Sequence, residues 1–209
     1  MNTIPCSIEY WTFLFSDITV KKNQLIDTIA TIDKEYEVAF DFYPIEFSRK
    51  SQTSGKSNLI HFTVDGEKNR GNPGVPSKWR NCGNGKYCVH GGSIPAVSVD
   101  SAQYGWATRT SHIERRLYIT SDLDINIENH YYYFHQTPTI PLRQWSSVKI
   151  SQTKNVKGQY IFEVRVNGKT TESVVNPIPR VYHNVKVFVS NPWYHPAEGF
   201  IRNLYYGGR

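Results

Sequence analysis

The chain has 209 residues, a formal net charge of +6, and aromatic residues at 14% of its positions. A length of this order suits one large domain or two small ones, and all-β sandwiches of this size commonly form one domain. The single methionine and the many aromatic residues argue against a helical bundle, because aromatic side chains favour strands. No apolar run approaches the roughly 18 residues of a membrane helix, so we expect no membrane insertion.

Short segments with strand character follow one another from the N-terminus. Apolar and aromatic residues fill 7–15, and 25–32 is rich in Thr and Ile, so we predict a strand in each. In 37–43 and 58–64, apolar side chains occupy every second position, which is the period of a strand with one buried face. Residues 94–99 predict a further strand.

Two hairpins are predicted in the second half of the chain. Residues 117–123 and 130–135 have strand character on either side of a turn-like segment. The clearest strand is 160–166, with apolar and polar residues in strict alternation. The dipeptide Asn167-Gly168 follows it and is the strongest short signal for a two-residue hairpin turn.

The C-terminal part combines strands with a loop stiffened by proline. We interpret Trp145 as a core residue because it introduces the strand predicted at 148–150. Alternating residues predict strands at 185–190 and 200–205. The two prolines in the segment between those strands cannot donate backbone hydrogen bonds, so they interrupt the ladder.

Several motifs carry a resemblance to a known family. They read Y-E-V-x-F-D at 36–41, W-x-x-V-x-I at 145–150, F-x-V-x-V-N-G at 162–168, and N-V-K-V, S-x-P-W-Y and G-x-I-R-N-L within 184–204. Together they resemble the strands of concanavalin A-like, laminin G-type domains, and the ending is most similar to a group of poorly characterised extracellular animal domains. The resemblance covers roughly residues 36–204, apart from a basic insertion.

The resemblance implies an all-β fold, an antiparallel two-sheet β-sandwich of the jelly-roll type. The strand pattern supports the same fold, because many short strands alternate with turn signals and not with helices. No internal repeat or domain linker is visible, so we expect a single lectin-like domain over 1–209. Proteins of this superfamily bind glycans or other proteins, and some branches cleave polysaccharides.

Positive charge is concentrated in one segment. Residues 49–90 contain eight Lys or Arg and two Asp or Glu, and this difference of +6 equals the net charge of the chain. A local excess of this kind favours acidic partners, and the competing interpretation is a solvated loop without a ligand. The insertion at about 65–92, which overlaps this segment, is rich in Gly, Asn and Pro.

The three cysteines predict one disulfide. Cys82 and Cys88 lie six residues apart in the Gly- and Asn-rich insertion, a spacing that suits a small closed loop. Cys6 is left over, which in a secreted protein indicates an intermolecular partner or a buried thiol. The cysteines and histidines lack the spacing of a zinc site.

Aromatic residues beside cationic ones form the predicted ligand-binding set. Sugars stack their C–H faces on aromatic rings, while Arg and Lys bind carboxylate or sulfate groups. The proline-flanked pair Trp193 and Tyr194 is either part of such a surface or part of the packing. The candidate binding residues are Arg70, Lys78, Trp79, Arg80, Tyr104, Trp106, Arg109, Trp193 and Tyr194.

Calcium is the one metal that the resemblance suggests, since laminin G-type domains often bind one Ca²⁺ with loop carboxylates. Asp65 and Asp100, at the ends of two predicted strands, are the candidate ligands. The competing interpretation is that both are surface carboxylates. No other cofactor is expected.

Catalysis is not expected. Glycosidases on this fold place two carboxylates on one strand in an E-x-D-x-x-E arrangement, and that motif is absent. The nearest pattern alternates Asp122, Asp124, Asn126 and Glu128, and it runs into a predicted turn.

We therefore predict a non-catalytic extracellular recognition domain, secreted or part of a cell-surface ectodomain, that binds a glycan or another acidic ligand. The alternative is a protein–protein adhesion or assembly module of a larger protein. A polysaccharide hydrolase is the third hypothesis. Nucleic acid would use the same basic and aromatic residues, but the extracellular resemblance argues against it.

Overall fold

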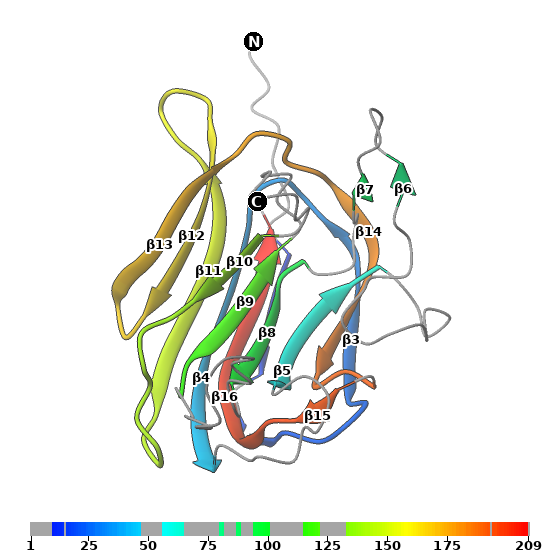
Figure 1. Ribbon diagram of the computed structural model, residues 1–209. Coiled ribbons are helices and arrows are strands. Elements are labelled where there is room, and N and C mark those ends of the chain that lie inside the picture. The colour runs from blue at the N-terminus through cyan, green and yellow to red at the C-terminus, as the bar shows by residue number, and fades with distance from the viewer. Residues whose placement is uncertain are drawn as a thin grey trace.

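The computed structural model describes residues 10–14, 16–46, 56–64, 80–81, 87–88, 94–100, 115–121, 133–192 and 194–208. Within this part of the chain the regular elements are all strands (Figure 1). Their bounds are β1 Tyr10–Leu14, β2 Ile18–Thr19, β3 Leu25–Ile32, β4 Tyr36–Glu46, β5 Lys56–Thr63, β6 Arg80–Asn81, β7 Tyr87–Cys88, β8 Ala96–Asp100, β9 Leu117–Ser121, β10 Tyr133–Gln136, β11 Ser146–Lys154, β12 Tyr160–Val166, β13 Lys169–Asn176, β14 Tyr182–Val189, β15 His195–Pro196 and β16 Glu198–Gly208.

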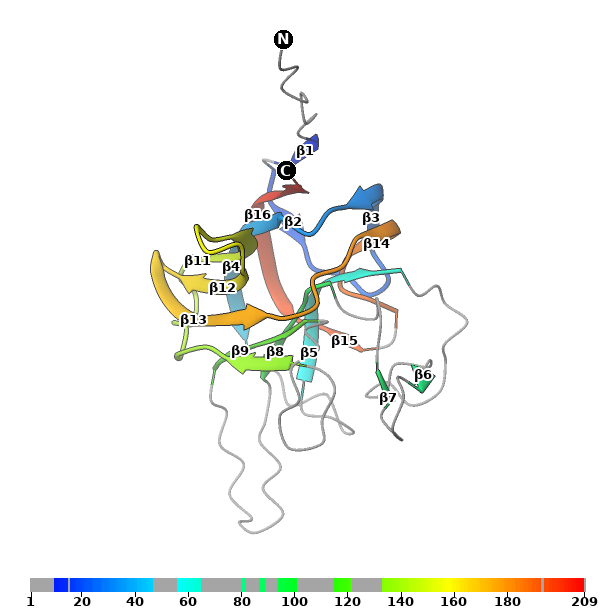
Figure 2. The same cartoon turned by 90° about the horizontal axis from the view of Figure 1, so that it is seen from above.

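The strands form two large sheets that pack face to face (Figure 2). Sheet A has the order β1-β16-β4-β11-β12-β13, with β2 beside β16. Sheet B has the order β10-β9-β8-β5-β14-β3, with β15 beside β5. Every pair in the two sheets is antiparallel except the two-residue contact of β15 with β5. The fold is thus the predicted all-β, jelly-roll sandwich.

The core is the layer between the two sheets. In β4, residues 36 to 44 alternate between buried and half-buried, so one face of the strand points into this layer. β12 also turns one face into this layer, as its alternating sequence predicts, since Phe162 and Val164 are fully buried. Phe62 of β5 and Ile119 of β9 are buried on the facing sheet and belong to the same cluster. Burial of both inner faces is the main stabilising contribution.

The two hairpin predictions are confirmed. β9 pairs with β10 antiparallel, with Ile119 opposite His135. β12 pairs with β13, and Asn167 and Gly168 between them have φ values of 51° and 77°. Positive φ at both central residues is the geometry of the turn that Asn-Gly favours, because this turn matches the twist of the strands.

The alternation of residues in the sequence predicts burial less well in the two C-terminal strands, β14 and β16. In β14, Phe188 and Ser190 after it are buried along with Val187, so the strand end is shielded on both faces and is not half-exposed. In β16, the register against β4 shifts between Arg202 and Tyr205, and Asn203 has a φ of 51°. This bulge changes the phase of the strand, since an extra residue interrupts the strict period of two.

Trp145 does not belong to the core. It lies on the outer face of sheet A, half-buried, with its ring centroid 5.2 Å from that of Tyr43. The guanidinium carbon of Arg202 lies 4.0 Å from the Trp145 ring centroid, within the range of a cation–π contact. Arg202 Nε also donates to Asp41 Oδ2 at 3.1 Å. The prediction that Trp145 is a core residue is therefore wrong, because a place just before a buried strand does not determine on which face of the sheet the ring lies.

A hydrogen bond joins the two sheets along one side of the sandwich. The hydroxyl of Tyr206, in β16 of sheet A, donates to Asp27 Oδ2, in β3 of sheet B, at 2.7 Å. The Tyr206 ring is buried and meets Phe62 edge-on at 5.5 Å. Burial and the adjacent Asp27 carboxylate raise the pKa of Tyr206. The tyrosine thus contributes both to the core and to a polar contact between sheets.

Replacing Tyr206 by Phe is expected to lower the free energy of unfolding by about 1–3 kcal/mol, because the half-buried Asp27 carboxylate loses the hydroxyl that donates to its Oδ2. Tyr160→Phe is the matched control. Its hydroxyl makes no hydrogen bond within the described residues, so a change of about 0.5 kcal/mol or less is expected. Urea denaturation measures both variants, and equal stability of the two would contradict this role of Asp27.

Candidate functional site

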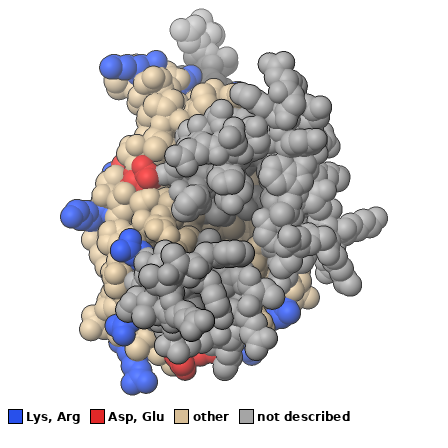
Figure 3. Space-filling model, in the orientation of Figure 1, with Lys and Arg blue, Asp and Glu red and all other residues tan. Residues whose placement is uncertain are grey.

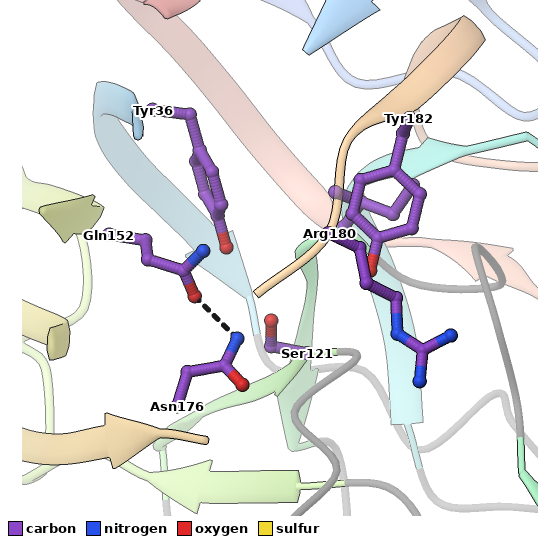
Figure 4. A pocket seen from close by; sticks show the side chains of 7 residues that line it. Tyr36, Ser121, Gln152, Asn176, Arg180 and Tyr182 are labelled. Carbon is purple, nitrogen blue, oxygen red and sulfur yellow. Dashed lines mark hydrogen bonds between the residues drawn. The ribbon is translucent and has the colours of Figure 1, made fainter. Parts of the chain in front are cut away.

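A pocket lies at one end of the sandwich, where strands of both sheets begin or end (Figure 4). Sheet A contributes the start of β4 and the ends of β11 and β13, and sheet B contributes the end of β9 and the start of β14. We call it the end pocket. Its lining residues are Tyr36, Ile94, Ser121, Gln152, Asn176, Arg180 and Tyr182.

A chain of hydrogen bonds fixes the two amide side chains of the end pocket. Gln152 Nε2 donates to the backbone carbonyl of Lys34 at 2.7 Å. Asn176 Nδ2 donates to Gln152 Oε1 at 2.7 Å, and the backbone N–H of Ile178 donates to Asn176 Oδ1 at 3.0 Å. Because the chain ends in one backbone acceptor and one backbone donor, it allows only one orientation of each amide. Both amides are buried, so the wall that they form is preorganised.

The opposite wall and the floor add hydroxyl groups and one cation. Figure 4 shows the polar ends of Tyr36, Gln152, Asn176 and Ser121 turned toward one another, with Tyr182 and Arg180 across from them. Ser121 is only 3% exposed and forms part of this lining.

A second polar contact lies between the edge strands of the two sheets. His135 of β10 faces β13, where its Nδ1 lies 3.1 Å from Glu172 Oε2 and its Nε2 lies 3.1 Å from Thr171 Oγ1. The His135 side chain is 11% exposed. Burial lowers the pKa of His135 from its ordinary value of 6.5, and the Glu172 carboxylate opposes this shift. The contact closes this side of the sandwich, opposite the side that Tyr206 closes.

The loop that carries Tyr194 is held by buried polar side chains at the other end of the sandwich. Asn191 is fully buried, and its Oδ1 accepts the backbone N–H of Tyr194 at 2.9 Å. Its Nδ2 lies 2.7 Å from His61 Nδ1, and its backbone N–H donates to Asn58 Oδ1 at 2.8 Å. Since Asn191 Oδ1 accepts, Nδ2 must donate to His61, which identifies His61 Nδ1 as an acceptor. Tyr194 itself is half-buried.

Most of the predicted site residues lie outside the described residues. Arg80 and Cys88 are placed only as backbone, directly opposite each other in the small β6–β7 pair. Figure 3 shows one face of the molecule, where the described Lys and Arg side chains are spread along the margin. The predictions for the side chains of Arg70, Lys78, Trp79, Arg80, Tyr104, Trp106, Arg109 and Trp193, for the disulfide of Cys82 with Cys88, for Cys6, and for the carboxylates 122–128 all lie outside what the structure describes.

The calcium prediction is likewise untested. Asp65 is outside the described residues, and Asp100 is placed only as the last backbone position of β8. Among the described side chains, no group of three or more His, Cys, Asp or Glu is arranged to hold a metal ion.

The described residues contain no helix long and apolar enough to span a membrane.

The residues of the end pocket were not predicted from the sequence as a site. They come from segments that are far apart in the chain, and of them only Tyr36 lies in one of the motifs quoted above. The only local signal is that Gln152 and Asn176 fall at inward positions of their strands, where an amide must find a partner. Their proximity depends on sheet order, which alternation does not specify.

The geometry defines a jelly-roll β-sandwich with a polar pocket at one end and buried polar contacts along two sides. No model of a known protein family matches the chain, and no curated protein matches its sequence.

Solved structures with a similar arrangement of strands include a heptameric SAP-like pentraxin from Limulus polyphemus, at a TM-score of 0.48 and 10% identity over 93% of this chain and 74% of that one. Domain 4 of AbnA, an extracellular arabinanase from Geobacillus stearothermophilus in complex with arabinotriose, has a TM-score of 0.44 and 14% identity over 94% and 75%. The botulinum neurotoxin serotype D binding domain has 0.47 and 12% over 95% and 39%. At these identities and TM-scores we draw no functional inference from the likeness.

The His135 contact predicts a pH dependence of stability. Because the pKa of His135 is lowered by folding, the unfolded chain takes up the proton first as the pH falls. The contribution of this residue is therefore complete above pH 6.5 and is lost as the pH drops below that value. Urea denaturation at pH 7.5 and pH 5 is expected to show a smaller loss of stability for His135→Gln than for the parent. His195→Gln, at an exposed position, is the control and should keep the parent's dependence. Equal losses in the parent and His135→Gln would refute the prediction.

Proposed function

We propose that this protein is a non-catalytic recognition domain that binds a glycan or another acidic ligand outside the cell. The observation that carries this proposal is the segment 49–90, which sets Lys78 and Arg80 beside Trp79 in a chain that folds as a jelly-roll sandwich. Arg and Lys form directional hydrogen bonds with carboxylate or sulfate, and aromatic rings stack on the C–H faces of sugars.

The sequence supports the acidic character of the ligand. The segment 49–90 holds the whole excess of positive charge, and it supplies cationic side chains next to tryptophan at 78–80. Such a segment raises the local concentration of polyanions by long-range attraction.

A binding role fits the sequence better than a catalytic one. The paired carboxylates that glycosidases of this fold use are absent, and the described residues of the end pocket include no carboxylate. Hydrolysis of a glycosidic bond requires an acid and a base or nucleophile on opposite sides of the bond. The described lining offers neither.

Chromatography on immobilised heparin tests the electrostatic part of this proposal. Replacing Arg70, Lys78 and Arg80 together by Ala removes three charges, each worth about 0.5–1 kcal/mol to an acidic partner. We expect a loss of affinity of about tenfold or more and elution at lower salt, because the contribution is electrostatic and screened by ions.

The free energy of unfolding should change little in this triple variant, because solvated charges contribute little to folding. Lys169→Ala, at the start of β13 and thus at the far end of that strand from Asn176, is the control for loss of a charge outside the insertion and should elute close to the parent. If the triple variant elutes at the same salt as the parent, the insertion is only a solvated loop. If the parent binds neither heparin nor any glycan on an array that includes acidic sugars, the proposed function fails.

A further inference from the structure

We infer that the outer face of sheet A binds a neutral sugar ring through a cluster of aromatic and polar side chains. This face is the one turned away from sheet B (Figure 2). The cluster includes no residue of the basic segment 49–90, so the inference goes beyond the proposed function. We call it the outer-face cluster, and its members are Asp41, Tyr43, Trp145, Phe200, Arg202 and Asn203.

Three aromatic rings form a row across neighbouring segments of sheet A. The ring centroids of Trp145 and Tyr43 are 5.2 Å apart, and those of Tyr43 and Phe200 are 6.3 Å apart. All three residues are half-buried, so the rings are held by packing and keep part of their surface toward solvent. Aromatic rings presented in this way are the surfaces on which sugars stack their C–H faces.

A polar row lies beside the aromatic row. Asp41 precedes Tyr43 by two residues on the same face of β4, so the two rows are about 7 Å apart, which is comparable to the width of a sugar ring. Asp41 Oδ2 accepts from Arg202 Nε at 3.1 Å and from Asn203 Nδ2 at 2.8 Å. A sugar ring stacked on the aromatic row can therefore place its hydroxyl groups against an ordered set of polar groups.

The polar row keeps both donors and acceptors for a ligand. Asp41 Oδ1 and Asn203 Oδ1 accept no hydrogen bond from the described residues, and the terminal nitrogens of Arg202 donate none to them. The side chains of Arg202 and Asp41 are 38% and 21% exposed, so a ligand can reach them. A sugar hydroxyl both donates and accepts, and this mixed capacity matches it.

The charges of the outer-face cluster cancel. Asp41 and Arg202 form an ion pair at 3.1 Å, and the guanidinium carbon of Arg202 lies 4.0 Å from the Trp145 ring centroid. Because the carboxylate and the guanidinium neutralise each other, the cluster offers no net charge to a ligand. A neutral sugar complements such a surface, whereas a polyanion gains no net attraction from it.

The outer-face cluster also unites three of the sequence motifs. Asp41 ends Y-E-V-x-F-D, Trp145 begins W-x-x-V-x-I, and Arg202 and Asn203 lie within G-x-I-R-N-L. Apolar members of these motifs, such as Phe40, face the core. The neighbouring positions of β16, β4 and β11 in sheet A bring the remaining polar and aromatic members together on the outer face.

Titration of the ¹⁵N-labelled protein with neutral hexasaccharides, followed by nuclear magnetic resonance, tests this inference. The probes are β-linked hexasaccharides of glucose, galactose, mannose and N-acetylglucosamine, in about 0.5 M NaCl, where long-range electrostatic attraction is screened. We expect at least one of them to shift the signals of the Trp145 indole N–H and the Asn203 side-chain NH₂. Both signals should saturate at the same ligand concentration, and the affinity should be the same at low salt.

Two variants locate the binding on the outer-face cluster. Trp145→Ala should weaken binding of that hexasaccharide about tenfold or more, and Trp145→Phe should restore part of it. Asn203 has a positive φ, which glycine tolerates, so Asn203→Gly removes only the amide and should weaken binding about threefold or more.

Matched controls are available in the same chain. Tyr160→Ala removes a half-buried ring at the other end of the β11–β12 pair from Trp145. Asn184→Gly changes an exposed position of β14, in sheet B, that has a φ of 55°. Both controls should bind like the parent, and thermal unfolding verifies that each variant is folded.

The outcomes separate this inference from the proposed function. Absence of binding to all four hexasaccharides overturns the inference, and the heparin experiment still decides the proposed function. Binding that Trp145→Ala and Asn203→Gly leave unchanged also overturns the inference, because the sugar then occupies another surface. If the parent binds a neutral hexasaccharide but not heparin, the inference stands and the acidic ligand of the proposed function is wrong.

Discussion

Phe40, Phe42, Phe62 and Phe162 lie in the layer between the two sheets, where all four are almost completely shielded from water. This dry layer is what makes the sandwich stable, because the hydrophobic contribution grows with the apolar area removed from water. The dry layer also constrains the polar groups at its margins. A polar side chain that a strand carries into the layer costs free energy unless it forms a hydrogen bond there.

The buried polar contacts of this protein lie at the margins of the core layer. Tyr206 and Asp27 meet along one side of the layer, and His135 and Glu172 along the other. At one end, the buried amides of the end pocket satisfy each other and two backbone groups in a single directed chain. At the other end, Asn191 does the same for the loop after β14. The same groups that close the core therefore have their orientations fixed by hydrogen bonds at its margins.

The sequence predicted the architecture well because period-two alternation reports directly which strand face is buried. β4 and β12 are examples, and the turn of Asn167 and Gly168 is encoded by two adjacent residues. Alternation was less informative for β16, where the bulge at Asn203 shifts the phase, and for Trp145, which lies outside the strand that it precedes. Bulges and packing on an outer face depend on neighbouring strands, and no local pattern specifies them.

The site was harder to predict than the fold. Sequence reasoning selected aromatic and basic residues in loops, since composition is visible there, and most of those residues lie outside the described part of the chain. The end pocket is built from residues of ordinary types, such as Ser121 and Gln152, brought together by the sheet order. Only the three-dimensional arrangement shows that Gln152 and Asn176 satisfy each other.

The central claim is that this sandwich domain binds an acidic glycan by electrostatic attraction to the basic segment 49–90. Nuclear magnetic resonance of the ¹⁵N-labelled protein tests it most directly, because backbone signals report which segment a ligand contacts. On titration with a heparin-derived oligosaccharide, the account predicts that signals from 49–90 shift and saturate together, and that added salt weakens the binding. If these signals stay in place while signals elsewhere saturate, the ligand binds at another surface and the claim is wrong.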